Sequence, residues 1–272
     1  MNPLFSPEGR AALKRLAQRA TLYGFDFDGT LAPIVSRPDD ALASAVTERK
    51  LATLGALVPV VILTGRSVAD MRRRIEFTPL HLIGNHGAEG LPSPLHHSLA
   101  DSLTASDVAP GHGTIAREWL HQWPGAIAPH SDDPGIFVED KTYSISIHYR
   151  LAADREAAER AVAAAVATLV PQPRLIGGKC VFNLLPDGAP DKGNALTTLV
   201  RFEHCDAAFY IGDDETDEAV FYGAPAHWVT VHIGESEDSA ARFFIEHQSE
   251  IDRCLDFLIA DAETSGSAKT RR

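Results

Sequence analysis

Cysteine is scarce in this 272-residue sequence, and long apolar runs and an excess of basic residues are absent. The three cysteines, Cys180, Cys205 and Cys254, are odd in number and form no Cys-x-x-Cys pair, so neither a zinc site nor a disulfide framework is predicted. The longest apolar run, residues 56–63, is too short to cross a bilayer, and residues 1–10 contain no signal-peptide core. We therefore expect a soluble, cytoplasmic protein with free thiols.

The charge balance is acidic, with 25 Lys plus Arg against 37 Asp plus Glu and a formal net charge of -12. This balance argues against the broad basic surface of nucleic-acid-binding proteins, so we expect neither a nucleic-acid nor a membrane partner. An anionic small molecule remains compatible, because a local cluster of cations can bind phosphate inside an acidic protein. The sequence gives no indication of protein partners. Hydrophobic residues make up 44%, which is enough for a sizeable buried core.

Short apolar segments alternate with helix-like segments in both halves of the sequence. The expected strands cover residues 22–27, 59–63, 80–84, 207–211 and 227–231. The expected helices cover residues 7–20, 41–57, 67–75, 192–202 and 215–222. This alternation predicts an α/β fold built on a parallel sheet.

The middle of the sequence has a different pattern. Residues 143–150 alternate strictly between apolar and polar side chains, which is typical of an antiparallel strand with one buried face. Helical patterns over residues 114–123 and 155–169 flank this strand, and a further strand is expected over 179–185. The middle segment is therefore expected to form an α+β domain of its own.

This domain is predicted to be an insertion at residues 106–186, which divides the α/β core into residues 1–105 and 187–263. Residues 91–113, rich in Pro, Ser, Gly and His, are expected to form a loop leading into it. The polar stretch 264–272 is expected to be a disordered tail.

Reactive polar groups follow three of the predicted core strands. Asp26 and Asp28 follow the first, Thr64 follows the second and Asp213 follows the fourth, while Lys192 begins a helix. Ligands of an open parallel sheet bind beyond the carboxyl ends of its strands, so these groups are expected to converge. Carboxylates gathered in one crevice require a cation, and oxygen ligands suit Mg²⁺. A lysine beside such a metal would suit a phosphoryl group.

The order of these groups resembles the four motifs of the haloacid dehalogenase-like phosphatases. They are Asp-x-Asp-Gly-Thr at residues 26–30, Thr-Gly-Arg at 64–66, Lys192, and Gly-Asp-Asp-x-x-Asp at 212–217. The resemblance implies a Rossmann-like parallel core. It also implies that the inserted α+β domain is a type-2 cap, which selects the substrate in that superfamily.

The resemblance and the chemistry together predict the catalytic residues. Asp26 is expected to attack phosphorus and form an aspartyl-phosphate. Asp28 is expected to protonate the leaving alcohol and then to activate water. Thr64 is expected to hydrogen-bond a phosphate oxygen, and Lys192 to offset the developing negative charge.

The same resemblance predicts the magnesium site. Asp26, the backbone carbonyl of Asp28 and Asp213 are expected to hold the ion, with Asp214 assisting through water. Asp217 is expected to orient the motif lysine as a supporting partner.

Four further segments resemble the trehalose-6-phosphate phosphatases, and the similarity extends over about residues 23–233. The segments are Gly-Asn-His-Gly-Ala-Glu at 84–89, Glu-Asp-Lys at 139–141, Ser-Ile-His-Tyr-Arg at 146–150 and Gly-Lys-Cys-Val at 178–181. This resemblance implies a hydrolase of carbohydrate metabolism. The implied reaction is the magnesium-dependent hydrolysis of trehalose 6-phosphate to trehalose and phosphate, the last step of trehalose biosynthesis.

A disaccharide is recognised by many hydrogen bonds to its hydroxyl groups, which the polar residues of these segments can supply. Glu139 and Lys141 are two positions apart, so an extended chain would point both side chains the same way. The predicted substrate-binding residues are Gly65, Arg66, His86, Glu139, Lys141, His148, Arg150, Lys179 and Asn183.

The sequence departs from this family at two positions. Asn183 and Leu185 stand where the family usually carries a sugar-binding glutamate and a basic residue; an asparagine still forms hydrogen bonds but has no charge. The alternatives are therefore a phosphatase of another sugar phosphate, such as sucrose phosphate or a mannosyl or glucosyl glycerate derivative, a phosphotransferase or mutase, and a non-catalytic sugar-phosphate sensor.

Overall fold

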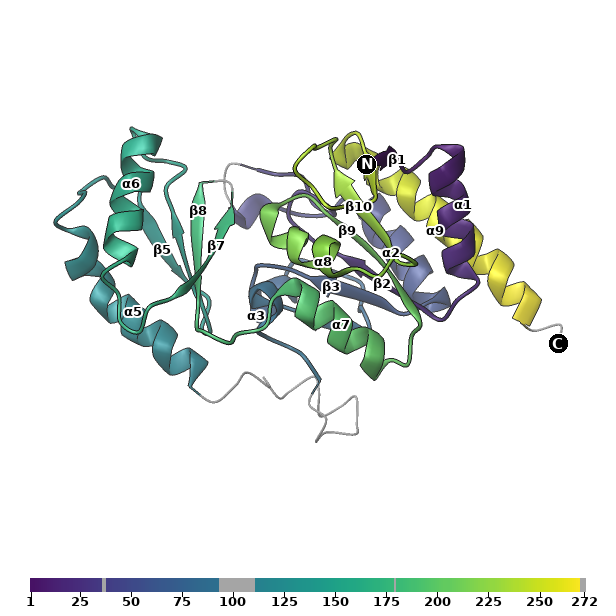
Figure 1. The fold of residues 1–272 in the computed structure, drawn as a ribbon, viewed down its shortest axis with the longest axis horizontal. Coiled ribbons are helices and arrows are strands. Elements are labelled where there is room, and N and C mark those ends of the chain that lie inside the picture. Colours follow the sequence, from purple (N-terminus) through teal and green to yellow (C-terminus); the bar gives the residue numbers. More distant parts are fainter. Residues whose placement is uncertain (36–37, 93–110, 179, 270–272) are drawn as a thin grey trace. The chain divides into compact units, whose positions relative to one another are not determined.

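A computed structural model describes residues 1–35, 38–92, 111–178 and 180–269 of the chain. The chain forms two compact units, one made of residues 1–105 and 191–272 and the other of residues 106–190. Figure 1 shows both units, each with its own sheet. Most of the loop expected at residues 91–113 lies outside the described residues. No described helix combines the length and the apolar character that crossing a membrane requires.

The first unit, called the core unit below, contains a seven-stranded sheet with the order β1-β11-β10-β9-β2-β3-β4. All of its paired strands are parallel, which confirms the predicted α/β core. The interior strand β2 is buried at every residue, as expected for a parallel sheet that is covered on both faces. The strands are β1 (Asn2–Pro3), β2 (Thr21–Phe25), β3 (Val60–Leu63), β4 (His81–Ile83), β9 (Ala207–Gly212), β10 (Val229–Ile233) and β11 (Phe243–Ile245).

Helices cover both faces of this sheet. They are α1 (Pro7–Ala17), α2 (Ala45–Leu57), α3 (Val68–Met71), α7 (Lys192–Phe202), α8 (Glu218–Gly223) and α9 (Ile251–Lys269), with short 3₁₀ helices η1 (Pro38–Asp40), η2 (Asn85–Gly87), η3 (Glu215–Asp217) and η4 (Gln248–Glu250). Successive residues of β2 mark the two faces, because a strand alternates its side chains. Gly24 faces Leu196 of α7, while Tyr23 lies near Asp261 of α9. Figure 1 accordingly shows α7 in front of the sheet and α2 behind it.

Side-chain caps fix where the helices of the core unit begin. Ser6 accepts a hydrogen bond from the backbone of Gly9 at the start of α1, as the sequence predicts. Ser44 caps α2, which therefore starts later than the expected residue 41. Asp191 caps α7 and accepts from the backbone of Asn194 at 2.8 Å, and this cap places Lys192 in the first turn of α7.

Several elements differ from the sequence-based expectations. The helix expected over residues 67–75 is the short α3, and the one expected over 215–222 is divided between η3 and α8. The strands β1 and β11 were not expected. Helix α9 continues to Lys269, so the part of the expected disordered tail from Thr264 to Lys269 is helical.

The second unit, called the cap unit below, contains an antiparallel sheet with the order β5-β6-β8-β7. Its strands are β5 (Phe137–Asp140), β6 (Ile145–His148), β7 (Arg174–Gly178) and β8 (Val181–Leu185), and its helices are α5 (His112–Ile127) and α6 (Arg155–Val166). Trp119 and Val162 of these helices pack with Ile145, Ile147 and Leu184 of the sheet in one apolar cluster. Strands β5 and β7 were not among the predicted strands.

Candidate active site

The polar groups of the four motifs lie around the carboxyl ends of neighbouring core strands. Asp26 follows β2, Thr64 follows β3 and Asp213 follows β9, and these strands pair in the order β9-β2-β3. The backbone of Asp26 still pairs with Ile211 of β9 at 3.0 Å. All three side chains and that of Lys192 are buried, with at most 8% of any of these residues exposed.

Lys192 connects the first and last motifs through its ammonium group. Its Nζ donates to Asp26 Oδ1 and to Asp217 Oδ1, both at 2.8 Å. The Tyr210 hydroxyl donates to the same oxygen of Asp217 at 2.5 Å. The other oxygen, Oδ2, accepts from the backbone N–H groups of Asp213 and Asp214, each at 3.1 Å. Asp217 therefore accepts four hydrogen bonds and holds Lys192 in place.

Burial and charge shift the pKa values of this cluster. Burial raises the pKa of Asp26 well above its usual value, the charge of Lys192 opposes this rise, and the charges of Asp217 and Asp213 add to it. Burial lowers the pKa of Lys192, but the two neighbouring carboxylates outweigh this effect and raise it. Lys192 is therefore a permanent cation at neutral pH.

The donor set of the cluster fits a divalent cation. Carboxylate oxygens of Asp26, Asp213 and Asp217 lie within 4.8 Å of one another, and Lys192 binds two of these three buried carboxylates, Asp26 and Asp217. Oxygen ligands with excess negative charge are what Mg²⁺ prefers. Because Asp217 is already bound by Lys192, Tyr210 and two backbone amides, Asp26 and Asp213 are the better candidates for metal ligands. Asp214 caps η3 through its side chain.

Gly29 explains why the first motif contains a glycine. Its φ angle is +81°, a conformation that side chains with a Cβ atom disfavour. A Cβ atom at Gly29 would lie 2.1 Å from Asp213 Oδ2. The carboxylate of Asp213 therefore packs directly on the backbone of the first motif.

Asp28 does not join the lysine network but pairs with Arg66. The guanidinium of Arg66 donates from Nε to Asp28 Oδ2 and from Nη2 to Asp28 Oδ1, both at 2.7 Å. Its Nη1 donates to Asp70 Oδ2 at 2.9 Å. Burial lowers the pKa of Arg66, but the hydrogen bonds and charges of the two aspartates outweigh this and raise it.

The loop at residues 84–89 lies against the Thr-Gly-Arg motif. His86 has a φ angle of +57°, and its backbone N–H donates to the carbonyl of Thr64 at 2.9 Å. Its ring occupies the space beside Gly65, where a Cβ atom would lie 2.4 Å from the ring. The carboxylate of Glu89 accepts from the backbone of Val68 at 2.9 Å. The structure thus brings the predicted residues Gly65 and His86 together with Thr64.

In the cap unit, predicted substrate-binding residues form one row across the sheet. Glu139, Ser146 and Asn183 occupy paired positions on β5, β6 and β8. The Ser146 hydroxyl donates to Asn183 Oδ1 at 2.6 Å. His148 Nε2 lies 2.9 Å from Glu139 Oε2, and Lys141 Nζ lies 3.8 Å from the same oxygen. Ser146 and Asn183 are buried and the Glu139 side chain is 41% exposed, so this row is a bonded polar cluster that reaches solvent at Glu139.

The other predicted substrate residues of the cap unit are Arg150 and Lys179. Arg150 is half-buried and follows β6, and its backbone carbonyl accepts from Arg155. Lys179 lies outside the described residues. The aromatic ring of Phe137, which the sequence did not single out, stacks on His148 with ring centroids 4.8 Å apart.

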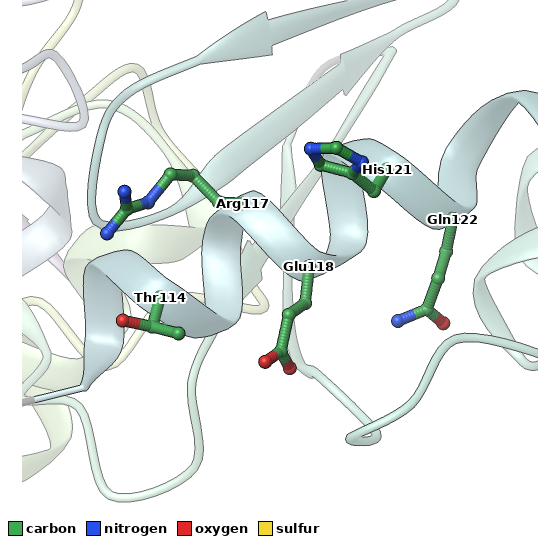
Figure 2. A pocket seen from close by; sticks show the side chains of 5 residues that line it. All are labelled: Thr114, Arg117, Glu118, His121 and Gln122. Atoms are coloured by element: carbon green, nitrogen blue, oxygen red, sulfur yellow. The ribbon is translucent and has the colours of Figure 1, made fainter.

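A separate hollow of about 490 Å³ lies on the outer side of α5 (Figure 2). Figure 2 shows its five lining side chains on successive turns of this one helix. It contains none of the predicted site residues and no cluster of like-charged groups. The lining residues are Thr114, Arg117, Glu118, His121 and Gln122.

A family of known proteins matches most of the chain. The trehalose-phosphatase family matches residues 24–249, a span that contains all four motifs and the cap unit. The chain belongs to the trehalose-phosphatase family.

Individual proteins give the extent of this similarity. A trehalose-phosphate phosphatase of Mycolicibacterium paratuberculosis is 34% identical over 232 residues, covering 82% of this chain and 57% of that protein. One from Mycobacterium tuberculosis is 31% identical over 253 residues, covering 89% of this chain and 62% of that protein. This trehalose-phosphatase family member thus spans less than two thirds of the length of these relatives. The C-terminal domain of a C. albicans trehalose-6-phosphate phosphatase has the same fold, with a TM-score of 0.77 at 21% identity, covering 96% of this chain and 98% of that domain.

Three contacts in this trehalose-phosphatase family member escape sequence reasoning. Tyr210 fits the apolar pattern of strand β9, which gives no sign that its hydroxyl donates to Asp217. Asp70 lies in a helical segment with no motif around it, yet it binds Arg66. Ser146 belongs to a quoted segment, but its partner Asn183 is 37 residues away. The Ser146–Asn183 pair depends on which strands are neighbours, whereas Arg66–Asp70 and Tyr210–Asp217 are local pairs, four and seven positions apart.

Proposed function

We propose that this chain is a magnesium-dependent phosphatase that hydrolyses trehalose 6-phosphate through an aspartyl-phosphate. The observation that carries the proposal is the buried group of Asp26, Lys192, Asp213 and Asp217 at the carboxyl edge of β2 and β9. The group lies in a chain of the trehalose-phosphatase family. An aspartate held against an ammonium group and beside further carboxylates suits a nucleophile for phosphate esters.

In the first step, an oxygen of Asp26 forms a bond to phosphorus, and the bond between phosphorus and the sugar oxygen breaks. Asp28 gives a proton to the leaving sugar oxygen. Thr64 hydrogen-bonds a phosphoryl oxygen, and the ammonium group of Lys192 offsets the negative charge of the phosphoryl oxygens. Lys192 is suited to this role, because Asp217 fixes its position before substrate binds.

In the second step, water attacks the phosphorus of the aspartyl-phosphate, and the bond from phosphorus to Asp26 breaks. Asp28 takes the proton from this water, which restores its starting state. The products are free sugar and phosphate, so no proton or electron is left over. A sugar hydroxyl in place of water would give a phosphotransferase, and product analysis distinguishes the two.

Asp26, Asp213 and the backbone carbonyl of Asp28 would hold the magnesium ion, with Asp214 assisting through water. A bound Mg²⁺ neutralises carboxylates and polarises a phosphoryl oxygen. The excess of buried carboxylates over ammonium groups supports this role. Asp217, saturated by four hydrogen bonds, would position Lys192.

We assign sugar recognition to the polar row of the cap unit. Glu139, Lys141, His148 and Asn183 offer a charged acceptor, a charged donor, an imidazole and a neutral amide. Glu139 contacts Lys141 and His148, and Asn183 is bound by Ser146, which prearranges these side chains for a ligand rich in hydroxyl groups. Arg150, Lys179, Gly65 and His86 complete the set that the family resemblance implies, whereas Arg66, also in that set, is bound to Asp28.

The first test is phosphate release from a panel of sugar phosphates, with Mg²⁺ and with EDTA. We expect trehalose 6-phosphate to be preferred and EDTA to remove the activity, because three buried carboxylates lie close together at the site. Restoration by Mg²⁺ but not by the larger Ca²⁺ would support a small, octahedral site for the ion. Equal or faster phosphate release from sucrose 6-phosphate would instead show that another sugar phosphate is the substrate. Asn183→Glu would then be the first variant to test, because Asn183 is neutral.

Tyr210→Phe is expected to lower kcat by about three- to tenfold with little change in KM. A hydrogen bond to a charged group is worth about 1.5–3 kcal/mol, and part of this fixes Asp217 and through it Lys192. Tyr23→Phe, on the neighbouring strand β2, is the matched control. Equal kcat values for wild type and Tyr210→Phe would show that Asp217 positions Lys192 without the tyrosine.

A further inference from the structure

Arg66 and Asp28 form a bidentate ion pair in the core unit. Two parallel hydrogen bonds of 2.7 Å join Nε and Nη2 of Arg66 to the two oxygens of Asp28. This bidentate geometry fixes both the position and the plane of a carboxylate, which a single contact does not achieve. The pair bridges the ends of β2 and β3 across 38 residues of sequence.

Arg66 is itself held from behind. Its Nη1 donates to Asp70 Oδ2 at 2.9 Å, and Asp70 also accepts from Arg74 at 2.8 Å and from Arg73 at 3.0 Å. The hydrogen bonds of Arg74 and Arg66 lower the pKa of Asp70 against the opposing effect of burial, so Asp70 stays ionised. The backbone N–H of Asp70 donates to Ser67, the cap of α3. These contacts leave the guanidinium little freedom to turn.

The face that Arg66 offers to Asp28 is the one that would grip a phosphate. Arg binds phosphate and carboxylate through the same planar fork of N–H groups. In this structure Nε and Nη2 of Arg66 are both bound to Asp28. The Asp28 side chain is nevertheless 36% exposed, compared with 6% for the Asp26 side chain. Each carboxylate oxygen has a second lone pair, so Asp28 keeps acceptor sites for a proton while it is paired.

We infer that Arg66 is a positioning residue that aims Asp28 at the leaving oxygen and at the attacking water, and that it does not bind the substrate phosphate. The inference rests on the proposed function and deepens it, because it concerns proton transfer at the same site. Asp28 moves a proton in both steps, and the side chain that fixes its plane therefore governs both.

The test compares Arg66→Gln and Arg66→Lys with wild type on two substrates of different leaving groups. Trehalose 6-phosphate releases a sugar oxygen that needs a proton, and p-nitrophenyl phosphate releases a stable anion that does not. With the sugar phosphate, kcat should fall by about 10- to 100-fold with KM changed less than about twofold, a part of the roughly 10²–10⁴-fold that general acid–base catalysis supplies. With p-nitrophenyl phosphate, the first turnover should stay fast and the second should slow. A burst of one nitrophenolate for each active site is the expected signature.

Arg73→Gln is the matched control, because Arg73 is exposed and binds the same Asp70 without touching Asp28. It should leave both substrates unaffected. Arg66→Lys keeps the charge and tests folding, since a lysine restores one contact but not the bidentate pair. Thermal melts of all variants report any loss of structure separately.

A rise in KM with kcat preserved in the Arg66 variants would overturn the inference, because it would place the guanidinium on the phosphate. Equal losses on both substrates without a burst would overturn it as well. Failure of the wild type on every sugar phosphate would refute the proposed function alone. The burst with p-nitrophenyl phosphate would still decide the role of Arg66.

Discussion

Asp26→Asn should reduce phosphate release by at least about 10⁴-fold while the chain stays folded and still binds sugar phosphate. The amide cannot form the aspartyl-phosphate, whereas Lys192 and Asp217 keep their contact. Wild-type enzyme quenched in acid with ³²P-labelled substrate should carry label that neutral hydroxylamine removes, as expected of an acyl phosphate. The Asp26→Asn variant should carry no label, and persistent turnover of this variant would contradict the covalent mechanism.

The same substitution should not destabilise the protein when metal is absent. Asp26, Asp213 and Asp217 lie close together, and burial together with the charges of the other two carboxylates raises the pKa of Asp26. Removing one of the three carboxylates therefore removes electrostatic repulsion that destabilises the folded state. In EDTA, the melting temperature of Asp26→Asn should equal or exceed that of wild type. Asp206→Asn, an exposed aspartate at the opposite end of β9, is the control and should change neither turnover nor melting.

Asp26, Thr64 and Asp213 are predictable from the sequence because each follows an apolar run of strand length. Parallel strands bring their carboxyl ends to one edge of the sheet, so residues that are far apart in sequence meet there without further information. Lys192 is predictable for a related reason, because Asp191 is a good cap and places the lysine in a first helical turn. The strand order and the burial of these groups in the structure agree with that reasoning.

The pairing of side chains at this edge could not be predicted in the same way. Asp28 and Arg66 both belong to recognised motifs, yet nothing in their spacing indicates a bidentate pair in preference to contacts with substrate. Tyr210 fits an apolar strand whichever way its hydroxyl points. These contacts follow from the twist and register of β2, β3 and β9, which a single sequence does not display.

The missed elements have separate causes. Helix α9 carries apolar residues at positions 251, 254, 255, 258 and 262, a helical spacing that signals a buried face. Its last turns, from Thr264, are polar and resemble a solvated tail. The polar composition of this stretch therefore led to the prediction of a disordered tail, although the apolar spacing before it indicates a helix. Strand β7 contains Gly177 and Gly178, and strand β5 exposes both of its ends, so neither shows the alternation by which β6 was recognised.

Lys192→Met should lower kcat by about 10²–10³-fold and, in EDTA, lower the free energy of unfolding by about 3–5 kcal/mol. The methionine fills the same volume but leaves Asp26 and Asp217 buried without their cation. The charge of Lys192 holds down the pKa of Asp26, so its loss raises that pKa further. The folded variant then keeps a proton that the unfolded chain releases near pH 4, and its stability should fall as the pH rises above that value.

Added Mg²⁺ separates the two roles of Lys192. A cation at Asp26 and Asp213 should recover part of the lost melting temperature of Lys192→Met, because it compensates the same carboxylates. It should not recover kcat, because the ammonium that faces the phosphoryl group is still missing. Lys50→Met is the control, since the pair of Lys50 with the exposed Asp256 should be worth about 0–1 kcal/mol. Full recovery of turnover by Mg²⁺ would show that Lys192 serves the fold and not the reaction.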